Sequence, residues 1–320
     1  MNTKSHHWAA QQERGNRLFL GITTLMVRWL PAFLMKPCIW FVVGYFYLTA
    51  PKPRRNIARY QARLRAVYPD APLPERAAVF RQFVAFGRAV CDRFAVWQRK
   101  IRYEDLVLHD PDNVYADMDA AGGRGHVFVC SHVGNVEICR ALVSHHQGFK
   151  LNVLVHSRHA EAFNEALVKA GADRIQLIQV TDLDAALMME LNRRLDAGEW
   201  LAIAADRVPV RGEKTVPVDF LGAKAEMPQG AWLLAGLLKT QIHTLFCIWE
   251  NGRYQLKLRR FADASGWKRG ERAEKVAAAA QAFADRLAEE CARTPLQWFN
   301  FYDFWKDEAD GQTRLLPPQP

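Results

Sequence analysis

The 320-residue sequence lacks the short motifs that define several large enzyme classes. It has no Gly-x-Ser-x-Gly turn, no Gly-x-x-x-x-Gly-Lys loop and no Gly-x-Gly-x-x-Gly turn that opens a helix. A serine hydrolase, a nucleoside triphosphatase and a nicotinamide-dependent enzyme are therefore disfavoured. Its six cysteines are dispersed and form no Cys-x-x-Cys pair, so the sequence predicts no metal site and no oxidising compartment.

A secretion signal and a long apolar run are also missing. Residues 1–16 are polar and carry no signal-peptide pattern. The longest uncharged apolar piece, Pro37 to Ala50, is shorter than the ~20 residues that a spanning helix needs. Its aromatic residues and basic flank favour helices that lie in a membrane interface. Two alternatives stay open: a pair of buried helices in a soluble domain, and one tilted span that reaches back to Leu34.

Acidic residues are outnumbered by basic ones. Lys and Arg number 43 against 34 Asp and Glu, which gives a formal charge of +9. This surplus suits phospholipid headgroups, an acidic carrier protein or nucleic acid, and the alternative is a generically basic surface. Because the basic residues are scattered and form no recognisable module, no nucleic-acid partner is predicted. We expect the chain to face the cytoplasm.

Short strands alternate with helices after Asp110, and half of all residues are hydrophobic. This pattern predicts an α/β fold with a mainly parallel central sheet flanked by helices, preceded by a hydrophobic helical N-terminal region. We expect a membrane-associating helical region and helical cap in residues 1–105, an α/β domain in 106–306 and a tail in 307–320. The predicted strands are His126–Ser131, Leu151–His156, Ile175–Gln179, Leu201–Ala204, His243–Trp249 and Tyr254–Leu258. The predicted helices are Val136–His146, Glu161–Ala170, Leu183–Ala197, Gly230–Leu238 and Arg272–Cys291.

A histidine and a carboxylate follow the first of these strands, in Ser131-His132-Val133-Gly134-Asn135-Val136-Glu137. Histidine titrates near neutrality and is the commonest general base. A carboxylate bonded to one ring nitrogen fixes the tautomer and leaves the other nitrogen free to take a proton. The spacing predicts His132 as a base and Glu137 as its orienter. The alternative is that His132 is a cap or core residue and Glu137 complements the helix dipole.

Other polar residues follow strand ends, where ligands bind in parallel sheets. Asp206-Arg207 follows one such strand and His156-Ser157-Arg158 another, so we expect them to share a site with His132. Arg158 and Arg207 are candidates for phosphate or carboxylate contacts. The alternatives are an Asp206–Arg207 pair and an exposed Arg158 without a specific contact.

Three further segments have predicted structural roles. Phe220-Leu221-Gly222 predicts a tight turn, and Pro228 predicts the start of a helix whose N-terminus would suit an anion. The aromatic stretch Leu296–Trp305 predicts a segment that closes the core.

These blocks resemble a known family. His132 with Glu137 resembles the His-x4-Asp/Glu signature of the lysophospholipid acyltransferase superfamily. The later blocks resemble its bacterial branch that includes the lipid A late (lauroyl/myristoyl) acyltransferases, although Asp206-Arg207 stands where those enzymes commonly carry Asp-Gln. The other blocks of this resemblance are Trp8–Gly15, Phe220-Leu221-Gly222 with Pro228 and Gly230, and Pro295–Phe299.

The resemblance implies an acyltransferase that transfers groups other than aminoacyl groups. The donor would be an acyl carrier protein or coenzyme A thioester, without a further cofactor, and the acceptor a hydroxyl or amine of a lipid-like molecule. His132 would deprotonate the acceptor, Glu137 would orient the imidazole, and backbone donors near Gly134-Asn135 would stabilise the oxyanion. The expected substrate-binding residues are Gly134, Asn135, Arg158, Asp206, Arg207, Phe220 and Gly222.

The implied location is the cytoplasmic face of the bacterial inner membrane, with the basic flanks on the anionic leaflet. Two alternative functions stay open: a non-catalytic lipid- or carrier-binding protein that retains the fold, and an aminoacyl-type transferase on the same scaffold.

Overall fold

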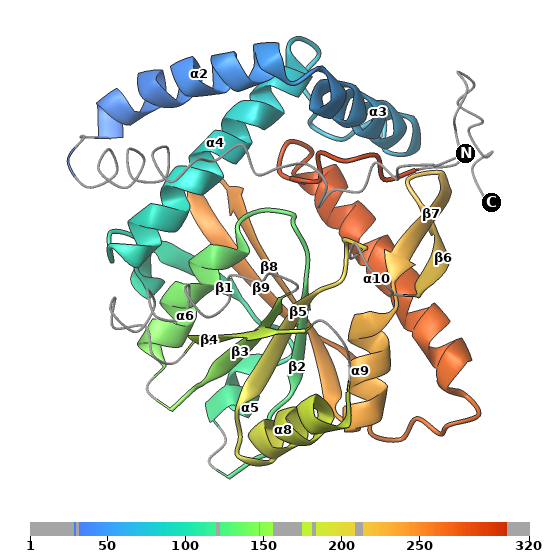
Figure 1. Ribbon diagram of the computed structural model, residues 1–320. Helices are drawn as coiled ribbons and strands as arrows, with labels where there is room; N and C mark the ends of the chain where they lie inside the picture. Colours follow the sequence, from blue (N-terminus) through green and yellow to red (C-terminus); the bar gives the residue numbers. More distant parts are fainter. Residues whose placement is uncertain are drawn as a thin grey trace.

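The computed structural model describes residues 29, 32–119, 122–146, 148–155, 175–180, 184–208 and 214–305 (Figure 1). The strands are β1 Leu106–His109, β2 Val127–Cys130, β3 Leu151–Val155, β4 Ile175–Gln179, β5 Trp200–Ala204, β6 Thr215–Phe220, β7 Ala223–Pro228, β8 Gln241–Glu250 and β9 Arg253–Asp263. The helices are α2 Ala32–Thr49, α3 Pro51–Val67, α4 Ala78–Trp97, α5 Val114–Asp119, α6 Arg140–His145, α8 Ala185–Asp196, α9 Gly230–Leu238 and α10 Arg272–Arg293, and the short 3-10 helices are η2 Tyr103–Asp105 and η3 Val136–Cys139.

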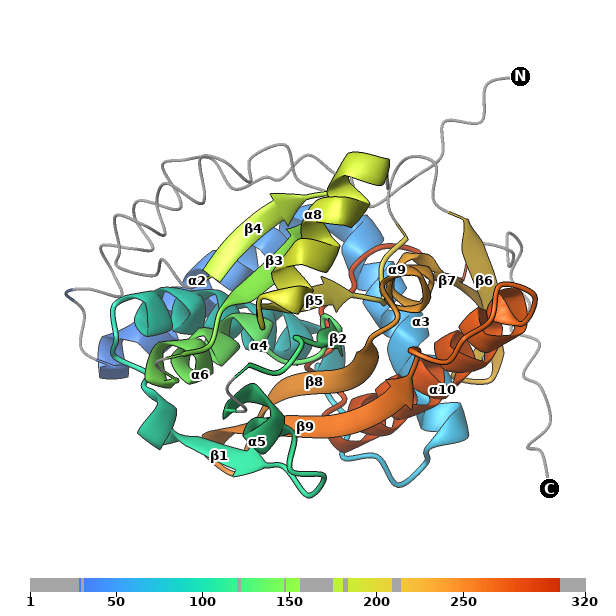
Figure 2. The ribbon, with the colours of Figure 1, turned by 90° about the horizontal axis from the view of Figure 1, so that it is seen from below.

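A seven-stranded sheet in the order β1-β9-β8-β2-β5-β3-β4 forms the centre of the fold (Figure 2). Strands β8, β2, β5, β3 and β4 are parallel to one another, whereas β9 is antiparallel to β8 and β1 is parallel to β9. Every residue of β2 is buried, as a central strand covered on both faces requires. The predicted α/β fold with a mainly parallel sheet is confirmed.

Two hydrophobic cores cover the two faces of this sheet. One contains the buried sides of α8, α9 and α10, and the other contains those of α5 and α6. Side chains of β2 alternate between them, since Val127 and Val129 face the first core and Phe128 and Cys130 the second. The sheet is therefore held rigidly between two helical layers, and its strand ends are well positioned to carry a site.

Helices α2, α3 and α4 cover one end of the sheet (Figure 1). Tyr47 on the inner side of α2 packs edge-on against Phe80 and Phe83 of α4, with ring centroids 5.2 and 5.5 Å apart. The outer side of α2 leaves Phe41 and Leu48 83% and 72% exposed. None of the described helices combines the length and the apolarity that a membrane crossing needs.

The sequence patterns missed three strands, β1, β6 and β7. Strands β6 and β7 form a hairpin whose turn, as predicted, is Leu221-Gly222, where both residues have positive φ angles of 49° and 76°. The prediction that Pro228 starts a helix is wrong, because Pro228 ends β7 and α9 begins at Gly230. The predicted helix Glu161–Ala170 lies outside the described residues.

Helix α10 provides a test of the first core. The fully buried ring of Phe283 lies 5.4 Å from the ring of Trp232. Phe283→Ala is expected to lower the free energy of unfolding by about 3–5 kcal/mol, because it removes apolar contacts and leaves a cavity. Glu289→Ala on the exposed side of α10 is the control and should change it by less than about 0.5 kcal/mol. Urea titration measures both, and equal stability of the two variants would contradict this packing.

Candidate active site

The backbone around His132 is fixed on both sides. The peptide oxygen of His132 accepts a hydrogen bond from the N–H of Phe299 at 3.0 Å, and the N–H of Gly134 donates to the carbonyl of Gln297 at 2.8 Å. Gly134 has a φ of +72°, and a Cβ there would lie 2.0 Å from the carbonyl oxygen of Cys247. Only glycine fits at this position, so His132 enters the site from a backbone with little freedom to move.

Asp206 lies directly beside His132 because of the strand register. Cys130 of β2 is paired with Ala204 of β5, so the residues two positions further along both strands are neighbours. The carboxylate of Asp206 contacts Nδ1 of His132 at 2.7 Å and accepts a hydrogen bond from the backbone N–H of His132 at 2.9 Å. The expectation that these two residues share a site agrees with this geometry.

The buried carboxylate of Asp206 takes further donors from the C-terminal segment. Trp298 Nε1 and Asn300 Nδ2 each donate to Oδ2 at 3.1 Å, and the hydroxyl of Tyr302 donates to the Asp206 carbonyl at 3.1 Å. Burial raises the pKa of Asp206, but His132 and Arg207 outweigh it and hold the pKa at about 2. Asp206 is therefore ionised at neutral pH although none of its surface is exposed.

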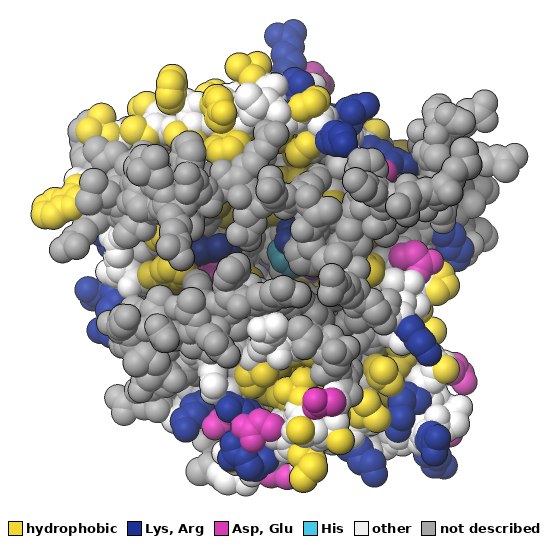
Figure 3. Space-filling view, viewed as in Figure 1, with side chains coloured by type: hydrophobic (Ala, Val, Ile, Leu, Met, Phe, Trp, Pro, Cys, Tyr) yellow, Lys and Arg dark blue, Asp and Glu magenta, His cyan; other side chains and the backbone are white. Residues whose placement is uncertain are grey.

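His132 has one ring nitrogen bound and one open. Its side chain is 31% exposed, and no described residue is hydrogen-bonded to Nε2. Burial lowers the pKa of His132, and the positive charges of Arg207 and Arg93 add to this effect, although Asp206 raises it. The imidazole is thus neutral at pH 7, with Nδ1–H facing the carboxylate and Nε2 able to accept a proton. Figure 3 shows a histidine side chain and basic side chains in a hollow near the centre of this face.

Glu137 does not make the contact with His132 that the spacing predicted. Its Oε2 accepts from Nε of Arg140 at 2.5 Å, one turn further along the chain. Burial raises the pKa of Glu137, but Arg140 and Arg93 outweigh it and hold the pKa below its ordinary value. Because Asp206 already occupies Nδ1 of His132, the carboxylate on the imidazole comes from the neighbouring strand and not from the same turn.

The backbone donors expected to form an oxyanion hole are already used. The N–H of Gly134 donates to Gln297, and the N–H of Asn135 donates to the carbonyl of Cys247 at 2.7 Å. The side-chain amide of Asn135 also donates to the carbonyl of Ala89 at 2.8 Å. Both residues therefore hold the loop in place, and in this conformation neither N–H is available to an oxyanion.

A comparison with family models bears on this geometry. The model for bacterial lipid A biosynthesis acyltransferases matches residues 4–307. The chain belongs to this family. Membership makes the protein an acyl-group transferase of lipid biosynthesis and agrees with the resemblance seen in the sequence. No curated protein matches the chain significantly.

The other expected substrate residues of this lipid A-type acyltransferase have different positions. Arg207 adjoins Asp206 but does not pair with it: Nε donates to Asn300 Oδ1 at 2.6 Å and Nη2 to the Phe299 carbonyl at 2.7 Å. Phe220 is buried among the rings of the C-terminal segment, and Gly222 completes the β6–β7 turn. Neither lies at His132. Arg158 lies outside the described residues.

Sequence reasoning missed that the C-terminal segment belongs to the site. The stretch Leu296–Trp305 closes the core as expected, but Trp298, Asn300 and Tyr302 also supply the donors around Asp206. The density of Trp, Tyr and Asn, whose side chains all donate hydrogen bonds, is the signal that was available.

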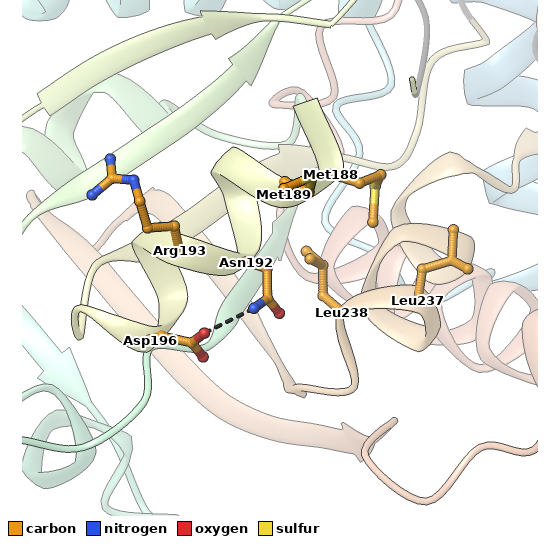
Figure 4. A pocket seen from close by; sticks show the side chains of 7 residues that line it. All are labelled: Met188, Met189, Asn192, Arg193, Asp196, Leu237 and Leu238. Atoms are coloured by element: carbon orange, nitrogen blue, oxygen red, sulfur yellow. Dashed lines mark hydrogen bonds between the residues drawn. The ribbon is translucent and has the colours of Figure 1, made fainter. Parts of the chain in front are cut away.

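Two other features lie away from this site. Asp117, His126 and His243 form the one described group whose ligand atoms lie within 4.8 Å of one another, but the carboxylate of Asp117 is paired with Arg260. His126 and His243 lie at the amino-terminal ends of β2 and β8, whereas His132 follows the carboxyl end of β2. A shallow pocket between α8 and α9 is lined by Met188, Leu238 and Asn192, and its carboxylate, Asp196, is taken up by Asn192 and Arg124 (Figure 4).

The Asp206–His132 contact predicts a direction of titration. In the wild-type protein the imidazole pKa of His132 should lie below its ordinary value. Asp206 stabilises the imidazolium, so Asp206→Asn should lower the pKa of His132 further. NMR of the imidazole as a function of pH measures both values. A higher pKa in Asp206→Asn would show that the carboxylate does not act on His132.

Proposed function

We propose that this acyltransferase moves an acyl chain from an acyl carrier protein or coenzyme A thioester to a hydroxyl or amine of a lipid-like acceptor, with His132 as the general base. The observation that carries the proposal is the neutral imidazole of His132, bonded through Nδ1 to the ionised, buried Asp206 and open at Nε2. This arrangement is typical of a general base.

In this reaction His132 carries one proton from the acceptor to the leaving thiolate. Nε2 takes the proton of the acceptor O–H or N–H while the acceptor oxygen or nitrogen attacks the thioester carbonyl carbon. The tetrahedral intermediate collapses, the carbon–sulfur bond breaks, and the imidazolium returns the proton to the leaving thiolate. Asp206 holds the tautomer and stabilises the imidazolium between the two transfers. No covalent acyl-enzyme is formed.

In this proposal Asp206 orients the imidazole of His132, a role that the sequence spacing predicted for Glu137. Glu137 acts through Arg140, whose guanidinium carbon lies 5.6 Å from the centre of the Trp97 ring on α4. This set of contacts joins the turn after His132 to the helix that covers it. Glu137 is therefore a positioning residue.

Aromatic side chains beside His132 suit an apolar acyl chain. The ring of Phe86 on α4 lies 5.3 Å from the ring of Phe299 and 5.0 Å from that of Phe301. Phe299 is itself bonded to the His132 backbone, and Phe86 is 38% exposed. An acyl chain lying on these rings would bring its thioester next to the base.

We also propose that the protein works at the cytoplasmic face of the bacterial inner membrane. The outer side of α2 exposes Phe41 and Leu48, and the exposed Lys52 and Arg55 follow at the start of α3. Apolar and aromatic side chains with adjacent basic ones favour an anionic lipid surface. The site would then face its lipid acceptor near the membrane.

Substitutions at the site test the mechanism. His132→Ala should lower kcat by about 10²- to 10⁴-fold, and Asp206→Asn by up to about 10⁴-fold because the imidazole loses its tautomer. Glu137→Gln should lower it much less. Transfer of a radiolabelled acyl chain from acyl carrier protein or coenzyme A to extracted lipids measures these effects.

The exposed Glu274→Gln serves as the control for this series, and thermal melting checks that every variant is folded. Full activity of His132→Ala would contradict the base. Transfer by the wild type from aminoacyl thioesters alone would favour the aminoacyl alternative, and binding without any transfer would favour a non-catalytic carrier- or lipid-binding role.

The α2 surface is tested with vesicles of anionic phospholipid. Phe41→Ser with Leu48→Ser should weaken vesicle binding by at least about 10-fold, because two exposed apolar side chains no longer enter the lipid. Met189→Ser on α8 replaces a side chain that is 73% exposed elsewhere, and it should bind like the wild type. Equal cosedimentation of all three proteins would rule out α2 as the membrane surface.

A further inference from the structure

Helix α4 places the guanidinium group of Arg93 close to the site. Arg93 is exposed, and it makes no hydrogen bond or ion pair with any described residue. Arg88 on the same helix differs, since its guanidinium lies 3.3 Å from the centre of the Trp249 ring and 3.4 Å from Asp92. Because the described residues leave its N–H groups without hydrogen-bond acceptors, this guanidinium can bind an external anion.

Two contacts show which side of α4 faces the site. The ring of Phe86 packs on that of Phe299, and the carbonyl of Ala89 accepts the Asn135 amide at 2.8 Å. Arg93 is seven residues after Phe86, which places it only about 20° away around the helix axis, one turn beyond Ala89. Arg93 therefore lies on the side of α4 that covers the loop after His132.

The turn of α4 that follows Arg93 also contacts the segment after His132. Trp97 contacts Arg140 and Glu137, so Arg93 lies between this contact and that of Ala89 with Asn135. The electrostatics agree with this position, since burial and then the positive charge of Arg207 and of Arg93 lower the pKa of His132 against the effect of Asp206.

The charges around His132 do not balance. Among the described residues, three guanidinium groups, those of Arg93, Arg140 and Arg207, lie near two carboxylates, those of Glu137 and Asp206. Arg140 is paired with Glu137, and Arg207 is bonded to the C-terminal segment beside Asp206. Because His132 is neutral, one positive charge among these described groups is in surplus, and Arg93 is the one of the three arginines that makes no hydrogen bond with a described residue. Guanidinium groups match the oxygens of phosphate in a two-point hydrogen bond.

We propose that Arg93 binds a phosphate group of a substrate held against His132. The proposal rests on the proposed acyl transfer, because both thioester donors carry a phosphate ester on the pantetheine arm and a phosphorylated lipid acceptor carries another. Donor and acceptor would thus each offer the same group to Arg93, a negatively charged phosphate ester. Arg93 is thus a substrate-binding residue and takes no part in the proton transfer.

Inorganic phosphate tests the site directly in the full-length protein. Phosphate is titrated into the wild type while the imidazole resonances of His132 are followed by NMR. Arg93→Ala should raise the Kd by at least about 10-fold, the loss expected for charge-assisted hydrogen bonds, and Arg93→Lys should have an intermediate value. Arg81→Ala is the matched control, since Arg81 is an exposed arginine of the same helix that lies three turns earlier.

Kinetics then decide which substrate provides the phosphate. The donor arm compares S-acyl-4′-phosphopantetheine with S-acyl-pantetheine, and the acceptor arm compares an N-acylglucosamine 1-phosphate with N-acylglucosamine. In one arm the wild type should favour the phosphorylated compound through a lower KM, and Arg93→Ala should remove this preference with little change in kcat.

Three results would overturn the proposal: no phosphate binding by the wild type, equal phosphate binding by Arg93→Ala, or a loss of kcat in Arg93→Ala that is the same with and without phosphate. Failure of the proposed function has a different signature. In that case the wild type transfers no acyl group, while the phosphate titration still reports on Arg93.

Discussion

The buried charge of Asp206 is the constraint on which the site depends. An ionised carboxylate without solvent contact is costly unless hydrogen bonds replace its water. Here the backbone and ring of His132, the indole of Trp298 and the amide of Asn300 provide them. These donors come from segments far apart in the sequence, so a stable charge requires the fold to be complete. The same carboxylate then fixes the imidazole.

The helices before the sheet hold the C-terminal donors in place. Tyr60 of α3 donates to the carbonyl of Pro295 at 3.1 Å, and Gln82 of α4 donates to the carbonyl of Trp298 at 2.7 Å. Both side chains are buried, so these hydrogen bonds are well protected from water. Helices α3 and α4 thus have two roles, since they cover the site and support the segment that stabilises Asp206.

Sequence patterns predicted the parallel strands well, because strands such as Ile175–Gln179 are short apolar runs between helices. They missed β6 and β7, whose alternating residues belong to a separate hairpin. At the site, the expectation that residues following the carboxyl ends of parallel strands lie close together agrees with the contact between His132 and Asp206. Spacing alone predicted that Glu137 bonds Nδ1 of His132, because distance along the chain does not reveal that Glu137 pairs with Arg140 instead. Arg93 could not be found, since its position depends on how α4 packs over the sheet.

The distribution of these contacts along the chain has a consequence for synthesis. His132 and its carboxylate partner leave the ribosome well before Trp298, Asn300 and Tyr302 do. Until that segment is made, the carboxylate of Asp206 lacks two of its four donors, the side chains of Trp298 and Asn300. A nascent chain therefore holds an unassembled site, and the assembly of the base is delayed until the segment that carries Trp298 and Asn300 has been translated.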